Sequence, residues 1–512
     1  MRVIPEPVEL TSLEGSFTLD AGTVLVASGD AARAEAEKLA AYLRPATGFA
    51  LPVVSDASAG SIELRLDDGL SDLGPEGYEL HASSDGVLLR APGAAGLFYA
   101  GQTLRQLLPP AVFSNEPVSG TEWTLPAVWV RDWPRFQWRG AMLDCCRHFM
   151  PFAFVKRFVD LLALHKLNVF HWHLSEDQGW RLEVRKYPRL TEVGAWRDET
   201  LIGHNDVYPH RFDGTRHGGY YTQAEARELV AYAAERHVMV LPEIEMPGHA
   251  SAAIAAYPEL GNTGEPIGVA RTWGVHENVF NVEESTITFL QDVLDEVMEV
   301  FPSPYLHVGG DECVKKQWRE SERAQARKRE LGIADENGLQ SWFIGRMDSY
   351  LHERGRKLVG WDEILEGGLA PHATVMSWRG VKGGIAAARA GHDVVMASNT
   401  HTYLDHYQSE DRESEPLAIS GFLPLEKAYD FDPVPAELTP EEAKRVLGSQ
   451  GQLWAEYMET PEHVQYMAFP RLTALAECFW TPRERKSWDA FQERLPEHLE
   501  RLDRLGVKYR KP

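Results

Sequence analysis

The sequence is poor in cysteine, in basic residues and in long apolar runs. It has only four cysteines in 512 residues, which do not make a disulfide framework, so a reducing compartment is the simpler interpretation. Lys and Arg total 52 against 76 Asp and Glu, and the net charge of −24 argues against nucleic-acid or anionic-membrane partners. Residues 1–7 lack a signal peptide's apolar region and no run reaches transmembrane length. We therefore expect no membrane association and a cytoplasmic location, with export possible only through a leader missing from this sequence.

Other features are also missing. The sequence has no phosphate-binding glycine loop and no convincing serine nucleophile elbow. All fifteen tryptophans lie at or after Trp123, a composition shift that places a domain boundary near residues 120–136. The hydrophobic content of 44% is ordinary for a soluble globular protein, and 512 residues can hold one large barrel and a second unit.

Residues 1–130 predict a small α+β domain. Strands are expected at 23–28, 61–66, 78–82 and 86–91, and helices at 30–43 and 94–108. No obvious catalytic cluster follows any of these elements. We therefore predict a non-catalytic domain that packs against the larger unit.

Residues 136–512 repeat one unit, in which a short apolar strand is followed by polar residues and often by a helix. Capping-box spacing at Thr222 with Glu225 and at Thr439 with Glu442 supports two of the helix starts. Such a repeat predicts a (β/α)8 TIM barrel, whose active site lies on the loops after the strands. The eight strands are expected near 137–143, 167–173, 238–244, 305–308, 357–361, 374–378, 393–397 and 446–454.

The fourth of these strands ends in two adjacent carboxylates, Asp311 and Glu312, after Gly309 and Gly310. On a regular strand they would face opposite sides, but where a strand opens into a loop both can point into one pocket. Two crowded carboxylates cannot both ionise easily, so one of them can serve as a general acid. Taken alone, the dipeptide is more often a solvated pair in a turn, and the other strand ends decide between the two interpretations.

Those strand ends combine aromatic, acidic and basic side chains. Aromatic rings can stack on the apolar face of a sugar while carboxylates and arginine bind its hydroxyl groups. A single tryptophan would be interpreted as core, but four at or near strand ends favour carbohydrate chemistry. The residues are Arg147, Asp177, His249, Trp342, Trp361, Trp378, Tyr403, Asp405, Trp454 and Glu456.

Two alternatives use the same residues. A metal-dependent barrel hydrolase could bind a divalent ion, although that leaves the tryptophans without a role. Its candidate ligands are His171, His173, His249, His307 and Asp311. A sugar-binding protein without turnover is the other alternative, and the intact carboxylate pair argues against it.

Four motifs in this chain resemble those of the glycoside hydrolase family 20 β-N-acetylhexosaminidases, in the family's order. The resemblance covers nearly the whole chain and implies an exo-acting, retaining enzyme without metal or organic cofactor. Such an enzyme releases non-reducing terminal β-linked GlcNAc or GalNAc through an oxazolinium intermediate formed by the substrate's own acetamido group. The motifs are His307 to Glu312, His171 to Leu174 with Asp177 and Gln178, Pro242 to Ile244 with Pro247 to His249, and Gly360 to Glu363.

The resemblance also implies a role for each matching residue. Glu312 is the general acid and then the base, and Asp311 orients the acetamido group. Tyr403 donates to the acetamido carbonyl oxygen, while Asp177 and His249 support Glu312. The remaining roles are sugar hydroxyl binding by Arg147, Asp405 and Glu456, and a cage around the acetamido methyl group made by Trp342, Trp361 and Trp454.

Two positions depart from the family pattern. Glu245 stands where relatives often have aspartate, so a supporting role there is open. Residues 404–433 contain no tryptophan, although relatives often place a stacking aromatic in this region. Tyr407 and Phe422 are the candidates for contacts beyond the first sugar.

Overall fold

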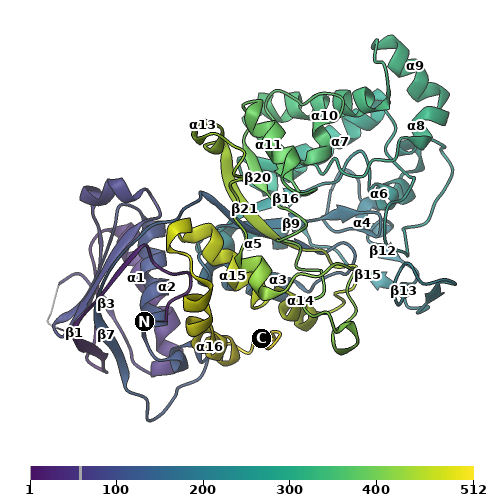
Figure 1. Cartoon of the computed structure of the whole chain (residues 1–512). Helices are drawn as coiled ribbons and strands as arrows, with labels where there is room; N and C mark the ends of the chain where they lie inside the picture. The colour runs from purple at the N-terminus through teal and green to yellow at the C-terminus, as the bar shows by residue number, and fades with distance from the viewer. Residues whose placement is uncertain (1, 57–59) are drawn as a thin grey trace.

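The computed structural model describes residues 2–56 and 60–512, which form an N-terminal sheet domain beside a barrel (Figure 1). The seven strands of the sheet are ordered β1-β7-β5-β6-β4-β2-β3. All four predicted strands and both predicted helices of this domain are present. They are β2 (Leu25–Ala27), β4 (Ile62–Leu66), β5 (Tyr78–Ser83), β6 (Gly86–Ala91), α1 (Asp30–Thr47) and α2 (Ala94–Leu107).

Three strands of this sheet were not predicted: β1 (Glu9–Leu19), β3 (Val53–Val54) and β7 (Trp123–Asp132). β1 pairs antiparallel with β7, and most of its residues face solvent, so it lacks an apolar run. β7 also pairs with β5. The stretch from Trp123 to Asp132 therefore belongs to the sheet of the N-terminal domain.

The second unit is a closed barrel of eight strands, which confirms the predicted TIM-barrel class. Every predicted barrel strand is present, with ends shifted by two residues or fewer. Around the barrel the strands are β16 (Met239–Glu243), β17 (Tyr305–His307), β18 (Lys357–Trp361), β19 (Thr374–Ser377), β20 (Val394–Met396), β21 (Val446–Leu453), β8 (Trp138–Asp144) and β9 (Val169–His173). Both predicted capping boxes form, at the starts of α5 (Gln223–Ala234) and α13 (Pro440–Ala443).

The C-terminal helix α16 (Trp488–Arg504) lies between the two units (Figure 1). Arg501 Nη2 donates to the carbonyl oxygen of Gln106 at 2.8 Å, and Arg494 Nη1 donates to that of Val3 at 2.9 Å. Buried carbonyl groups need such partners, because an unpaired one would lose its hydrogen bonds to water. These contacts tie α16 to the N-terminal domain.

Residues 175–218, between β9 and α5, form three two-stranded sheets that were not predicted. Each strand has only two residues, too short for a periodic pattern to show in the sequence. One of the three is the hairpin of β13 (Leu201–Ile202) and β14 (Arg211–Phe212), which we call the 201–212 hairpin. It lies at the edge of the molecule in Figure 1, on the barrel side.

All four cysteines are free and buried, as expected from their small number. Burial raises the pKa of the Cys313 thiol to about 11, so it stays protonated at neutral pH. Among the described residues, no helix has the length and apolar character needed to cross a bilayer.

Two buried histidines lie where α16 packs on α3 (Phe152–Leu164) and α15 (Arg471–Trp480). The Nε2 atoms of His165 and His498 are 3.0 Å apart, and Thr473 Oγ1 is 3.0 Å from His165 Nε2. Burial lowers the pKa of His165 to about 4. Burial, and then the nearby charges of His165 and Arg501, lower that of His498 well below 6.5.

We therefore expect acid to destabilise this helix packing. Below pH 6.5 these histidines bind protons in the unfolded chain but not in the folded chain. The free energy of unfolding therefore falls as the pH drops from 6.5 towards 4. Protonating His165 alone would cost about 3 kcal/mol. Calorimetric melting between pH 7.5 and 4.5 should show a smaller fall in Tm for His498→Gln than for the wild type. An equal fall in Tm for both proteins would contradict the destabilising role of the buried histidines in acid.

Candidate active site

A cavity of about 220 Å³ at the carboxyl ends of the barrel strands contains most of the predicted site residues. A larger cavity of about 660 Å³ lies at α12 (Leu425–Tyr429) and the start of α16, but no predicted site residue lines it. We therefore place the candidate site in the smaller cavity. Its predicted lining residues are Arg147, Asp311, Glu312, Trp361, Trp378, Tyr403, Asp405, Trp454 and Glu456.

The turn after β17 brings both carboxylates to this cavity. Gly309 and Gly310 have φ values of 66° and 97°, in the left-handed region that glycine tolerates. A Cβ atom on Gly309 would lie only 1.6 Å from Glu245 Oε2. Asp311 is 9% exposed, whereas the Glu312 side chain is 37% exposed. Asp311 thus forms part of the cavity's buried wall, and Glu312 lies nearer to solvent.

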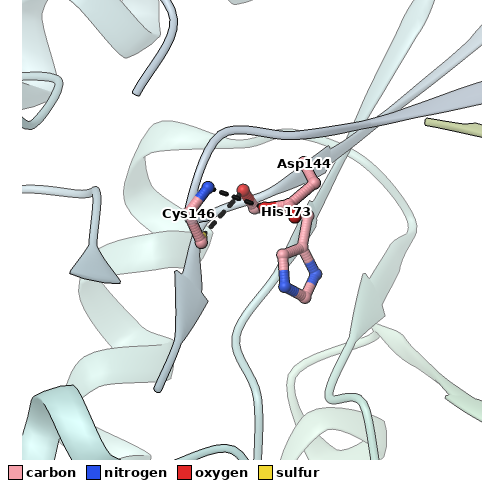
Figure 2. A group of neighbouring side chains, drawn as sticks. All are labelled: Asp144, Cys146 and His173. Atoms are coloured by element: carbon pink, nitrogen blue, oxygen red, sulfur yellow. Dashed lines mark hydrogen bonds between the residues drawn. The ribbon is translucent and has the colours of Figure 1, made fainter. Parts of the chain in front are cut away.

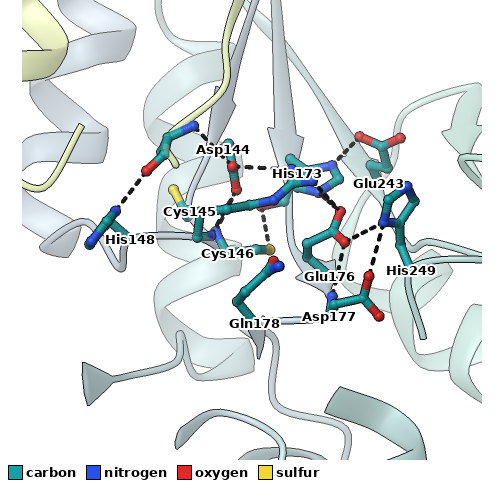
Figure 3. A network of polar contacts seen from close by, with 12 residues as sticks. Asp144, Cys145, Cys146, His148, His173, Glu176, Asp177, Gln178, Glu243 and His249 are labelled. Atoms are coloured by element: carbon teal, nitrogen blue, oxygen red, sulfur yellow. Dashed lines mark hydrogen bonds and ion pairs between the residues drawn. The ribbon is translucent and has the colours of Figure 1, made fainter. Parts of the chain in front are cut away.

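His249 connects the carboxylate pair to buried acids behind it. Its Nε2 is 3.4 Å from Asp311 Oδ2 and 3.5 Å from Glu312 Oε2. Its Nδ1 is 2.6 Å from Glu176 Oε1 and 3.1 Å from Asp177 Oδ2 (Figure 3). Burial by itself lowers the pKa of His249, but the carboxylates of Glu176 and Asp311 raise it well above its usual value. The structure thus brings Asp177 and His249 together behind Asp311 and Glu312.

Glu176 is a member of this network that sequence reasoning missed. Its Oε2 is 3.1 Å from Arg147 Nη2 and 3.3 Å from His173 Nε2, in addition to its contact with His249. Burial raises the pKa of Glu176, but the charges of Arg147 and His249 lower it well below 4.5. The sequence feature that could have identified Glu176 is its position next to Asp177, in the polar stretch that follows β9.

The turn after β8 fixes Arg147. Asp144 Oδ1 accepts a hydrogen bond from the backbone N–H of Cys146 at 2.7 Å (Figure 2). It also accepts one from the backbone N–H of Arg147 at 3.2 Å. Asp144 Oδ2 accepts from Arg147 Nη1 at 3.2 Å. The guanidinium lies 5.0 Å from the centre of the Trp454 ring, so it is held between a carboxylate and an aromatic face.

Asp405 and Glu456 also line the cavity, and each has an oxygen available to a ligand. Among the described residues, Asp405 Oδ1 and Glu456 Oε2 have no hydrogen-bond partner, although both are buried. Burial raises the pKa of Asp405, and the Glu456 carboxylate raises it further. Burial likewise raises the pKa of Glu456, although Arg147 opposes it. Buried unpaired oxygens beside a cavity are suited to accept hydrogen bonds from a ligand's hydroxyl groups.

Three tryptophans and Tyr403 form the aromatic wall. The rings of Trp361 and Trp454 are 5.7 Å apart, and Trp378 stacks on Tyr403 at 6.1 Å. The Trp361 indole donates to Glu243 Oε1 and the Trp378 indole to Glu363 Oε2, each at 2.9 Å. These hydrogen bonds to acidic side chains fix the orientation of the rings.

Trp342 does not line this cavity, so its assignment to the aromatic cage is wrong. It lies within helix α10 (Glu336–Glu353), with the guanidiniums of Arg327 and Arg346 each 5.5 Å from its ring centre. The Trp342 ring is partly buried and packs against the main hydrophobic core rather than in the cavity. Trp378, which directly follows β19, lines the cavity instead.

The three remaining candidates do not line the cavity. Glu245 is fully buried behind Gly309, where burial and the neighbouring charge of Asp311 raise its pKa well above 4.5. Tyr407 and Phe422 pair with each other through a strand-like bridge. The segment between β20 and β21 instead contributes Asn399, His406, Ile419 and Ser420 to the lining.

The ligands of the metal alternative do not converge on one point. His307 Nδ1 and His171 Nε2 contact the two Glu243 oxygens at 2.7 and 3.0 Å, and His173 Nδ1 also contacts Glu243. His249 belongs to a separate group with Asp311 and Glu312. Among the described residues, no group close enough to share an ion combines all five candidates. The carboxylate of Glu243 occupies the centre of the other three histidines.

Comparison with known proteins agrees with this geometry. Residues 136–483 match the model for the catalytic domain of glycosyl hydrolase family 20, and residues 1–133 match that for domain 2 of the same family. The chain belongs to glycosyl hydrolase family 20. The resemblance carried by the four sequence motifs is therefore confirmed, and the chain's barrel is the family's catalytic domain.

Relatives of this family 20 chain match most or all of its length, whereas the chain spans less than two thirds of the first of them. It is 45% identical to a β-hexosaminidase of Porphyromonas gingivalis, with 100% of this chain and 64% of that protein covered. A β-hexosaminidase of Vibrio furnissii is 36% identical, with 93% of this chain and 76% of that protein covered. The solved structure of the family 20 β-N-acetylhexosaminidase of Streptomyces coelicolor superposes with a TM-score of 0.87 at 34% identity, with 100% and 97% covered.

Proposed function

We propose that this chain is an exo-acting, retaining β-N-acetylhexosaminidase that releases terminal β-linked GlcNAc or GalNAc by substrate-assisted catalysis. The observation that carries the proposal is one small cavity in which Asp311 and Glu312 face three tryptophans and the group of Arg147, Asp405 and Glu456. A mutant of the β-hexosaminidase of Streptomyces plicatus, 34% identical to this chain, has been solved in complex with the product GlcNAc, which supports the substrate class.

The buried polar group makes the enzyme exo-acting. Arg147, Asp405 and Glu456 are each less than 9% exposed, so the hydroxyl groups they bind must belong to the last sugar of a chain. A further sugar on that side would separate them from their partners and leave buried charges unpaired. The indoles of Trp361, Trp378 and Trp454 then surround the acetamido methyl group.

In the first step, the acetamido carbonyl oxygen attacks the anomeric carbon. Asp311 accepts the hydrogen bond of the acetamido N–H and stabilises the positive charge that develops on the oxazolinium ring. The Tyr403 hydroxyl donates a hydrogen bond to the carbonyl oxygen and keeps its proton, since burial and the nearby Asp405 raise its pKa well above 10. Glu312 gives its proton to the leaving oxygen as the glycosidic bond breaks.

In the second step, Glu312, now a carboxylate, takes a proton from water. That water attacks the anomeric carbon from the face the leaving group occupied and opens the oxazolinium ring. Two inversions give retention. His249 lies between Glu312 and the buried acids Glu176 and Asp177, and its contact with Glu312 Oε2 holds that carboxylate in position.

The proposal is tested by comparing an aryl 2-acetamido-2-deoxy-β-glucoside with the plain aryl β-glucoside, each with and without chelator. We expect hydrolysis of the acetamido sugar alone, at a rate that chelator leaves unchanged. Equal rates would identify a glycosidase that uses two carboxylates and no substrate assistance, and chelator-sensitive hydrolysis would favour the metal alternative. Calorimetric binding of the acetamido sugar without product release would favour a sugar-binding protein.

A further inference from the structure

Exposed apolar and aromatic side chains gather on loops beside the cavity. Tyr208 is 74% exposed and Val207 65%, both in the turn of the 201–212 hairpin. Val275 is exposed on a neighbouring loop, which the backbone bond from Leu201 N–H to the Arg271 carbonyl joins to the hairpin. Single exposed apolar residues are ordinary, but a group of them on connected loops marks a candidate binding surface.

The hairpin is attached directly to the cavity wall. His204 Nε2 lies 2.5 Å from the carbonyl oxygen of Ile419, which lines the cavity. The His204 ring stacks on Tyr457 at 5.2 Å with an interplanar angle of 9°, and Tyr457 follows the cavity residue Glu456. The Tyr457 hydroxyl accepts a hydrogen bond from the Asn205 N–H at 3.0 Å. The hairpin therefore continues the wall of the site outward.

The exposed tyrosine is held in place before any ligand binds. Its ring stacks on His210 at 4.3 Å with an interplanar angle of 18°. His210 Nε2 is 2.7 Å from the Asn205 carbonyl oxygen, and Asn205 Oδ1 accepts from the Trp273 N–H at 3.3 Å. Because the ring is already ordered, a ligand that stacks on it loses little conformational entropy to binding.

We propose that Tyr208, stacked on His210, is a platform for the outer sugars of a bound oligosaccharide, on the leaving-group side of the scissile bond. This inference rests on the proposed function. An exposed aromatic face flanked by hydrogen-bonding side chains fits a neutral sugar ring, which presents C–H groups on its face and hydroxyl groups at its edge. The platform supplies the stacking aromatic that residues 404–433 do not provide.

The test is Tyr208→Ala, assayed with two substrates. We expect KM for the tetrasaccharide of β-1,4-linked GlcNAc to rise about threefold to tenfold, the loss that one aromatic stacking contact predicts. The aryl GlcNAc glycoside, which is too short to reach the platform, should keep its kcat and KM. Tyr208→Phe retains the ring and should behave as the wild type with both substrates.

Three results would overturn the platform. Equal effects on both substrates would show a general disturbance of the site, and no effect on either would show a ring that touches no substrate. A change from dimer to monomer on light scattering, with unchanged tetrasaccharide KM, would assign the surface to a second copy of the chain. Failure of the wild type to cleave either substrate would instead reject the proposed function itself.

Discussion

Replacing Glu312 with glutamine should reduce kcat/KM for a GlcNAc disaccharide by about 10²-fold to 10⁴-fold, the usual contribution of a general acid. For an aryl glycoside whose phenol is strongly acidic, the rate of glycosidic bond cleavage by this variant should fall far less. Its leaving group departs without a proton, whereas a sugar alkoxide does not. The position of Glu312 beside His249, with a side chain 37% exposed, leaves it accessible to the leaving oxygen.

The measurement is kcat/KM for Glu312→Gln over a series of aryl glycosides whose phenols span a range of pKa values. The variant's rate should depend steeply on the phenol pKa where the wild-type rate does not. Glu363→Gln is a matched control. Burial and the nearby Asp311 raise the pKa of Glu363 to about 8, so an amide resembles its protonated state at neutral pH. Equal losses on good and poor leaving groups would falsify the acid role of Glu312.

Asp311→Asn is the second change with a large expected effect. We expect about 10²-fold to 10³-fold slower turnover of disaccharide and activated aryl glycoside alike, as when a group that stabilises transition-state charge is removed. The reason is that both substrates must form the oxazolinium ring, whatever their leaving group. Because the charge develops only in the transition state, kcat should fall much more than KM rises.

Asp177→Asn is the control for this variant. Asp177 Oδ2 is 3.1 Å from His249 Nδ1 and influences the reaction through that ring. Asp177→Asn should therefore lose less activity than Asp311→Asn. The ratio of rates on good and poor leaving groups separates Asp311 from Glu312, since Asp311→Asn should leave the ratio unchanged. Near wild-type rates in Asp311→Asn would remove it from the mechanism.

Strand positions were predictable because they depend on short-range pattern. Each barrel strand is a short apolar run followed by polar residues, and such runs were found to within two residues of their ends. The sheet strands β1 and β7 were missed because β1 faces solvent along most of its length and β7 contains Pro126. Their pairing with each other, across more than a hundred residues, stabilises them.

Residues of the site that lie in motifs were also predictable, and residues defined by contacts were not. Asp311 with Glu312, and Asp177 with His249, stand in recognisable stretches that end barrel strands. Glu176 differs only in the direction of its side chain, towards Arg147, His173 and His249, and that direction depends on how β8, β9 and β16 are joined.

By itself, the sequence determined the barrel, the carboxylate pair and the family, because strand period and motif spacing are local properties of the chain. Tertiary structure decided which aromatic rings meet. The family resemblance assigned Trp342 to the cage, yet it is Trp378, directly after β19, that lines the cavity. It also decided that the 201–212 hairpin borders the site, through contacts of His204 and Asn205 with residues more than two hundred positions away. Such contacts exist only after the barrel has closed, since closure is what brings the loops of different strands to one face.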